Sequence, residues 1–160
     1  MKKILFGLVV LGMTILPSTS FAQGNNQQIA DEVINMVKAQ WAAQAADPTN
    51  SAEIDKNTAD DYTEFNASFA TRIDGKALSS RLSEASAKDS SRRLAAEMLN
   101  PKVQVYGDVA ILTYNFAGEV KDKDGEVKPT RAKSTRVYAK INGKWKLVHA
   151  NFASDPLPKD

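Results

Sequence analysis

A cation and the chain's single histidine lie close together in the C-terminal third of the sequence. Arg136 belongs to the run TRVY, and His149 to the run LVHAN. A buried arginine requires hydrogen-bonding partners or an anionic ligand, because an unpaired charge away from water is costly. A histidine in a pocket can exchange protons near neutral pH or contact a ligand. Each has a structural alternative: Arg136 at the solvent or the rim of a dimer, and His149 as a hydrogen-bonded residue of a sheet.

The sequence lacks the other common arrangements of catalytic and metal-binding residues. One histidine and no cysteine supply too few ligands for a zinc site and exclude disulfides. Asp60 and Asp61 are adjacent, so on a strand they point to opposite faces and do not form a catalytic dyad. There is no Gly-rich phosphate loop and no nucleophile elbow. We therefore expect no metal and no cofactor.

The region around Arg136 and His149 is expected to be a meander of strands. Asn142-Gly143, between two β-favouring runs, is typical of a tight hairpin turn, and Asp124-Gly125 indicates another. Pro101 interrupts an earlier run, which predicts either one long strand bent at the proline or two strands. The expected strands are residues 93–106, 108–119, 130–141 and 144–153.

Helices are expected in the first half of the chain. Residues 27–46 carry apolar side chains at helical spacing, with Asn25 or Asn26 as the cap and Asp47-Pro48 as the stop. A short helix at 50–58, a strand at 59–66 and a helix at 76–87 complete the expected elements. Helices followed by strands predict an α+β domain in which helices cover one face of the sheet.

Alternation along the strands predicts which side chains share a face. Ser134, Arg136 and Tyr138 fall on one side of their strand, and Thr135 and Val137 on the other. Because neither face is purely polar, we expect helices on one face and either a second subunit or a bent strand on the other. This favours a homodimer or a higher homo-oligomer.

The N-terminal segment has the pattern of a signal peptide. Lys2 and Lys3 precede the apolar run Ile4–Leu16, and Ser20-Phe21-Ala22 predicts cleavage after Ala22. The alternative is an uncleaved anchor, although the run is short for a span of about 20 residues. We expect residues 1–22 to be a signal peptide and 23–160 a single domain, secreted or periplasmic, with no stable membrane insertion after processing.

The charge balance argues against nucleic acid as a partner. The chain has 21 basic and 19 acidic residues, and removal of Lys2 and Lys3 leaves the two kinds equal in number. Nucleic-acid binding depends on clustered basic residues, and Arg92-Arg93 is only a pair, for which a solvated face is the simpler interpretation.

Several short motifs carry a resemblance to a known family. They are Leu99-Asn100-Pro101, Val103, Val105, Gly107-Asp108, Asp124-Gly125, Thr135-Arg136-Val137-Tyr138, Gly143-Lys144-Trp145-Lys146 and Val148-His149. Through them the C-terminal half resembles the association domain of calcium/calmodulin-dependent protein kinase II. The whole chain after residue 22 resembles the nuclear transport factor 2-like (SnoaL-like, ketosteroid-isomerase-like) superfamily.

The resemblance implies a cone-shaped fold. Three N-terminal helices would pack in a strongly bent, mostly antiparallel sheet, leaving a pocket at the open end, and dimers would form through the outer sheet face. The carboxylate base of the isomerases aligns near Asn66 and their second acid near Ser134, which makes isomerase chemistry unexpected. The pocket arginines of the kinase domains correspond to Arg136 alone, with Phe116 and Phe152 in place of others.

Together these observations favour an exported protein that binds a small molecule. Arg136 would hold an anionic or carbonyl end, assisted by His149 or Asn151, with Ser134 nearby. The structural alternative is that the aromatic residues are core. Two further functions stay open: an isomerase, dehydratase or hydrolase that uses His149 as its base, and an oligomerisation module. The expected apolar wall consists of Trp41, Tyr62, Phe65, Tyr114, Phe116 and Tyr138.

Overall fold

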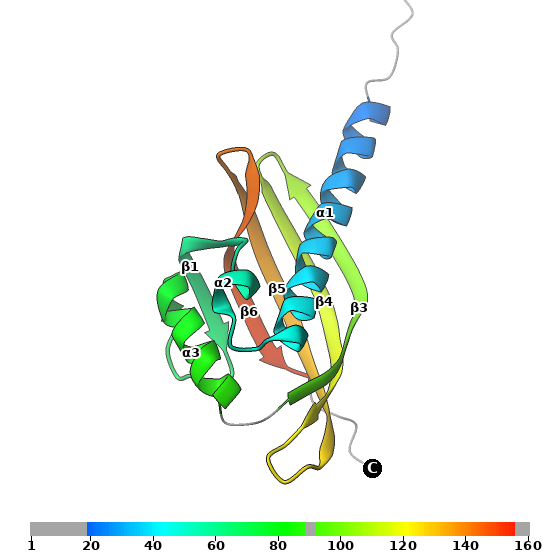
Figure 1. Ribbon diagram of the computed structural model, residues 1–160. Coiled ribbons are helices and arrows are strands. Elements are labelled where there is room, and N and C mark those ends of the chain that lie inside the picture. The colour runs from blue at the N-terminus through cyan, green and yellow to red at the C-terminus, as the bar shows by residue number, and fades with distance from the viewer. Residues whose placement is uncertain (1–18, 89–91, 156–160) are drawn as a thin grey trace, which may run out of the picture.

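The computed structural model describes residues 19–88 and 92–155. Three helices and six strands alternate early and then give way to strands alone, which confirms the α+β class (Figure 1). The elements are α1 Thr19–Ala46, α2 Ser51–Ile54, β1 Thr58–Asn66, β2 Ile73–Asp74, α3 Lys76–Lys88, β3 Arg92–Tyr106, β4 Val109–Lys121, β5 Val127–Ile141 and β6 Lys144–Ser154.

Helix α1 is longer than its apolar pattern predicted. Ile29, Val33 and Val37 are buried on one face, as expected from their spacing. The helix begins at Thr19, so the prediction that Asn25 or Asn26 caps it is wrong. No proline interrupts residues 19–26, and the backbone ladder continues through them. The predicted cleavage point after Ala22 falls near this start, and the apolar run Ile4–Leu16 lies outside the described residues.

Helix α2 is a single turn, shorter than the predicted 50–58. Asn50 caps it as expected, since its side-chain oxygen accepts a hydrogen bond from the Glu53 backbone N–H at 3.2 Å. The helix ends at Ile54, and the chain then enters β1 at Thr58, whose branched side chain suits a strand. The Asp74-Gly75 turn and the following helix α3 lie where they were predicted.

The six strands form one sheet in the order β2-β1-β6-β5-β4-β3. All neighbours are antiparallel except β1 and β6, which run parallel. Strand β3 is one continuous element whose pairing with β4 shifts between Leu99 and Lys102, beside Pro101. Asn142 and Gly143, both with positive φ, make the predicted tight turn between β5 and β6.

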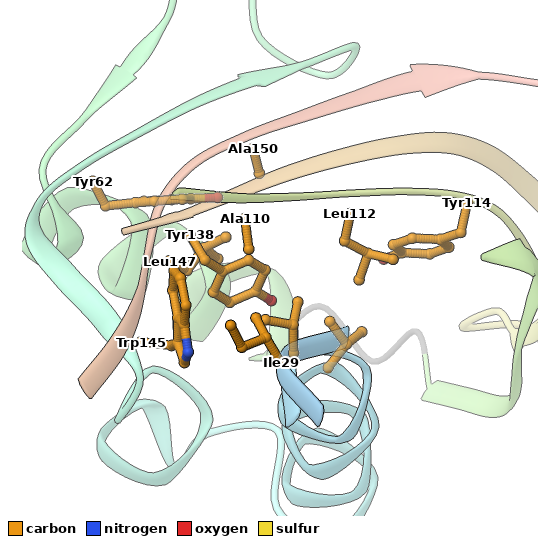
Figure 2. Close-up of a cluster of buried hydrophobic side chains, with 11 residues drawn as sticks. Ile29, Tyr62, Ala110, Leu112, Tyr114, Tyr138, Trp145, Leu147 and Ala150 are labelled. Atoms are coloured by element: carbon orange, nitrogen blue, oxygen red, sulfur yellow. The ribbon is translucent and has the colours of Figure 1, made fainter. Parts of the chain in front are cut away.

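The helices lie against one face of the curved sheet, called here the inner face (Figure 1). Helix α1 crosses β3 and β4, while α3 lies against β1 and β2. Figure 2 shows the core between α1 and the sheet, where apolar side chains from both meet. No helix within residues 19–88 and 92–155 is long and apolar enough to cross a membrane. The core residues include Ile29, Val33, Val37, Ala110, Leu112, Tyr138, Trp145 and Leu147.

Candidate functional site

A cleft of about 490 Å³ opens between the inner face and the helices. This volume is in the range of small-molecule sites, about 300–1,000 Å³. Its aromatic wall centres on Trp41, whose ring meets Tyr114 and Phe116 edge-on at centroid distances of 5.9 and 5.5 Å. Of the residues proposed from the sequence, the cleft brings together Trp41, Tyr62, Tyr114, Phe116, Ser134 and Arg136.

Arg136 is buried in the cleft, with 6% of its surface exposed. Its Nε donates to the Tyr114 hydroxyl at 3.1 Å and its Nη1 to the Gln40 side-chain oxygen at 2.7 Å, while the guanidinium lies 5.2 Å from the centre of the Phe152 ring. Arginine stays protonated in proteins. No carboxylate within residues 19–88 and 92–155 forms an ion pair with it. Its charge is therefore compensated only by neutral groups and a ring.

Arg93 also lines the cleft, which corrects two expectations from the sequence. We expected a solvated Arg92-Arg93 pair and only one cleft arginine, but Arg93 is half-buried and its guanidinium lies 5.2 Å from the Phe116 ring centre. Its Nη1 donates to Gln44 at 2.7 Å. Burial, followed by the charge of Arg136, lowers the pKa of Arg93. The Phe116 ring that was expected to replace an arginine instead supports one.

Two buried polar atoms of the cleft have no hydrogen-bond partner within the described part of the chain. They are the Nε of Arg93 and the hydroxyl of Ser134. Leaving a buried polar group unpaired costs about 1–3 kcal/mol. Both residues line the cleft together with Arg136. A ligand with acceptor atoms would satisfy these donors.

A carboxylate that the sequence analysis did not select forms the other polar end of the cleft. Glu64 is 8% exposed, and it accepts hydrogen bonds from the Tyr62 hydroxyl at 2.7 Å and the Asn66 amide at 2.9 Å. Glu64 follows Tyr62 by two residues on β1, so strand alternation would have placed both on one face. The resemblance placed the position of the isomerase base near Asn66, and the structure puts the carboxylate of Glu64 beside that amide in the cleft.

The buried hydroxyl of Tyr62 is expected to make the protein less stable at alkaline pH. Burial, then the charge of Glu64 and the hydrogen bond to it, raises the pKa of Tyr62 well above its usual value near 10. The folded state therefore holds this proton more tightly than the unfolded state does. The contribution of this proton to the free energy of unfolding is complete below pH about 10 and declines as the pH rises above that value. We expect the free energy of unfolding of wild type to fall from pH 9 to pH 11, and that of Tyr62→Phe to fall less. Equal slopes would contradict this assignment.

Three predicted pocket residues lie on the other side of the sheet, called here the outer face. Phe65 and His149 meet edge-on at 6.0 Å, and the His149 ring shares a 2.8 Å hydrogen bond with Thr63. Asn151 pairs with Thr135 and lies in an outer-face hollow. The expectation that His149 or Asn151 assists Arg136 is wrong, because the sheet separates them. The enzyme hypothesis required His149 inside the pocket, and the outer-face position of His149 does not support it.

Tyr138 belongs to the core and not to the cleft wall. It is 2% exposed and lines a separate cavity of about 20 Å³, which Arg136 also lines. Burial raises the pKa of Tyr138. The described residues contain no cluster of three or more histidine and acidic side chains that could hold a metal.

Chemically, the cleft combines a cationic side, an aromatic wall and an acidic side. Arg136 and Arg93 can hold an anionic group, and the rings around Trp41 can cover an apolar body. Glu64 and the buried Asp55, which accepts from Ser80 at 2.6 Å, carry the negative charge.

Comparison with known protein families gives one family match. The model of the calcium/calmodulin-dependent protein kinase II association domain matches residues 29–156. Among curated proteins, the type II kinases of Caenorhabditis briggsae and Caenorhabditis elegans are each 33% identical over 60 residues, 37% of this chain. The match covers only 11% and 8% of those two kinases.

Solved structures share the fold at low sequence identity. The association domain of the C. elegans kinase has a TM-score of 0.67 at 19% identity, covering 81% of this chain and 98% of that one. A nuclear transport factor 2-like protein from Salmonella enterica has a TM-score of 0.67 at 17% identity, with 83% and 95% covered. A ketosteroid isomerase-like protein from Parabacteroides distasonis has 0.64 at 21%, with 79% and 88% covered. At these identities the likenesses establish the fold alone.

Proposed function

Because the chain belongs to the calcium/calmodulin-dependent protein kinase II association domain family, with a nuclear transport factor 2-like fold, we propose that its cleft binds a small anionic molecule. The observation that carries this proposal is the buried, uncompensated charge of Arg136. Burying a cation without a carboxylate costs stability, and such a cost is typical of functional sites. An anionic ligand would remove that cost when it binds.

The surroundings of Arg136 favour a carboxylate on an apolar body. The unpaired Arg93 Nε and Ser134 hydroxyl supply additional donors. The rings of Trp41 and Phe116 supply apolar contact. The site thus resembles ordinary small-molecule pockets, in which a few polar groups orient a largely apolar ligand.

Calorimetric titration with matched pairs of compounds tests the proposal. We expect hexanoate and 3-phenylpropanoate each to bind at least tenfold more tightly than its own primary amide. The reason is that a charge-assisted hydrogen bond contributes about 1.5–3 kcal/mol. Equal binding of acid and amide, or no binding by either acid, would overturn the proposal.

A second proposed function is homo-oligomerisation through the outer face. Solved structures similar to this chain include association and hub domains. The helices cover only the inner face, and the centre of the outer face carries half-buried apolar and hydroxyl side chains. At this centre, Ile111, Val137 and the imidazole of His149 form one row across β4, β5 and β6. An uncharged sheet face of this kind suits contact with a second copy.

A charge at the centre of the outer face should dissociate the oligomer. We expect Val137→Glu to shift the native mass spectrum to the monomer, because the new carboxylate would be buried without a partner. Ile141→Glu is the matched control, since Ile141 is 41% exposed near the Asn142-Gly143 turn. A wild-type monomer, or an unchanged Val137→Glu oligomer, would count against this interface.

We also propose that the protein is exported, because residues 1–22 have the composition of a signal peptide. The mass of protein isolated from its own host tests it. We expect a chain that begins at Gln23, whereas an intact N-terminus would argue for the uncleaved alternative.

A further inference from the structure

Buried charges of opposite sign line the same cleft from different strands. Arg136 on β5 and Glu64 on β1 are 6% and 8% exposed. Within residues 19–88 and 92–155, neither takes part in an ion pair. Each is compensated by uncharged groups: Tyr62 and Asn66 donate to Glu64, whereas Arg136 donates to uncharged oxygens.

The strand register places the two charged residues across a gap. Glu64 pairs with Ala150 on β6, and Ala150 pairs with Arg136. Neighbouring strands lie about 4.8 Å apart, so the two backbones are about 10 Å apart. Ala150, whose side chain is a single methyl group, is the residue that lies between them in the register. The two charges therefore face a common space without touching, and that space belongs to the cleft.

We propose that the ligand of the cleft is a zwitterion, whose anionic group binds at Arg136 and whose ammonium group binds at Glu64. This inference rests on the proposed anion-binding function and adds the second charge. A simple anion would neutralise Arg136 and leave Glu64 uncompensated, while a molecule with both charges would pair each one. The ligand class is a small amino acid whose amine and carboxylate are separated by an apolar spacer.

The unpaired groups support the same polarity of binding. The Arg93 Nε and the Ser134 hydroxyl, both on strands of the Arg136 side, can donate to an anion. Asp55, on the loop that leads into β1, is 8% exposed and adds negative charge beside Tyr62. The cleft is therefore electrostatically divided, and a ligand with two different ends fits it in one orientation.

Calorimetric titration of the protein with three related acids tests this inference. The probes are hexanoate, 6-aminohexanoate and 6-acetamidohexanoate, which differ only at the end expected to reach Glu64. We expect 6-aminohexanoate to bind wild type at least tenfold more tightly than either of the others. Glu64→Gln should abolish that preference, because the amide keeps the shape and loses the charge. Asp61→Asn, on an exposed position of the same strand, is the matched control and should keep the preference.

The outcomes separate this inference from the proposed function. If hexanoate binds and the amino group adds nothing, the zwitterion inference is overturned and the anion site stands. If no acid binds, both are overturned. A preference that survives Glu64→Gln also overturns the assignment of the ammonium to Glu64. The wild-type comparison among the three acids decides the question even if a variant fails to fold.

Discussion

Replacing Arg136 with methionine is expected to stabilise the protein and, at the same time, to weaken its binding of carboxylates. Arg136 is buried and forms no ion pair among the described residues, so its desolvation is offset only by neutral partners. Methionine has a similar length and no charge. Exchanging buried ion pairs for apolar side chains of similar volume is often neutral or stabilising by about 1–4 kcal/mol. We expect a gain of roughly 1–3 kcal/mol in the free energy of unfolding.

The two partners of Arg136 limit this gain only slightly. Gln40 is half-buried and Tyr114 borders the cleft, so water can replace the lost guanidinium at both. In ligand binding, by contrast, water does not replace the charge of the lost guanidinium. We expect the affinity for hexanoate to fall about tenfold to a hundredfold, as for the loss of a charge-assisted hydrogen bond.

Urea unfolding and calorimetric titration of the same samples measure both effects. Arg81→Met on α3 is the control, because Arg81 is exposed and, among the residues that the structure describes, donates only to the Ala77 carbonyl of its own helix. We expect it to change neither quantity appreciably. If Arg136→Met lowers stability and leaves affinity unchanged, Arg136 is a structural residue and the proposed site is wrong.

The inner face was predictable from the sequence wherever the strands are regular. Alternation on β5 placed Ser134, Arg136 and Tyr138 on one side, and the structure buries all three. The same rule, applied from Tyr62, would also have selected Glu64. Regular alternation works because each residue along a strand reverses the side-chain direction.

Irregular pairing explains why the sequence misplaced His149 and Asn151. Counting by two from the buried Leu147 puts both residues on the inner face. In the structure Val137 pairs with His149 but Tyr138 pairs with Leu147, so Val148 is an extra residue on β6. Such a bulge reverses the phase of every later side chain. The inner positions therefore become Ala150 and Phe152, which single-sequence periodicity does not reveal.

Irregular pairing also explains why the position of Arg93 in the cleft could not be predicted from the sequence. Strand β3 pairs with β4 through two register shifts, between Arg93 and Ala95 and between Leu99 and Lys102. A face assigned at one end of β3 therefore does not extend to the other. Arg93 reaches the cleft because the curved sheet brings the start of β3 beside Gln44 of α1.

The largest loss of stability is expected from Leu112→Ala at the centre of the core. Leu112 is fully buried on β4, between Val103 and Arg136 in the register, and faces helix α1 (Figure 2). Truncating the Leu112 side chain removes buried apolar surface. It also leaves a cavity, because α1 and the sheet can move together only enough to fill part of the space. Substitutions of this kind cost about 2–5 kcal/mol.

The same strand offers a control for Leu112, because Val109 is 38% exposed and its truncation removes little buried surface. We expect Val109→Ala to cost less than about 0.5 kcal/mol in urea unfolding, with similar denaturant slopes for both variants. A small cost for Leu112→Ala would mean that α1 does not pack tightly on β4. Since α1 also supplies Gln40 and Trp41 to the cleft, loose packing there would remove the rigid frame on which the Arg136 site depends.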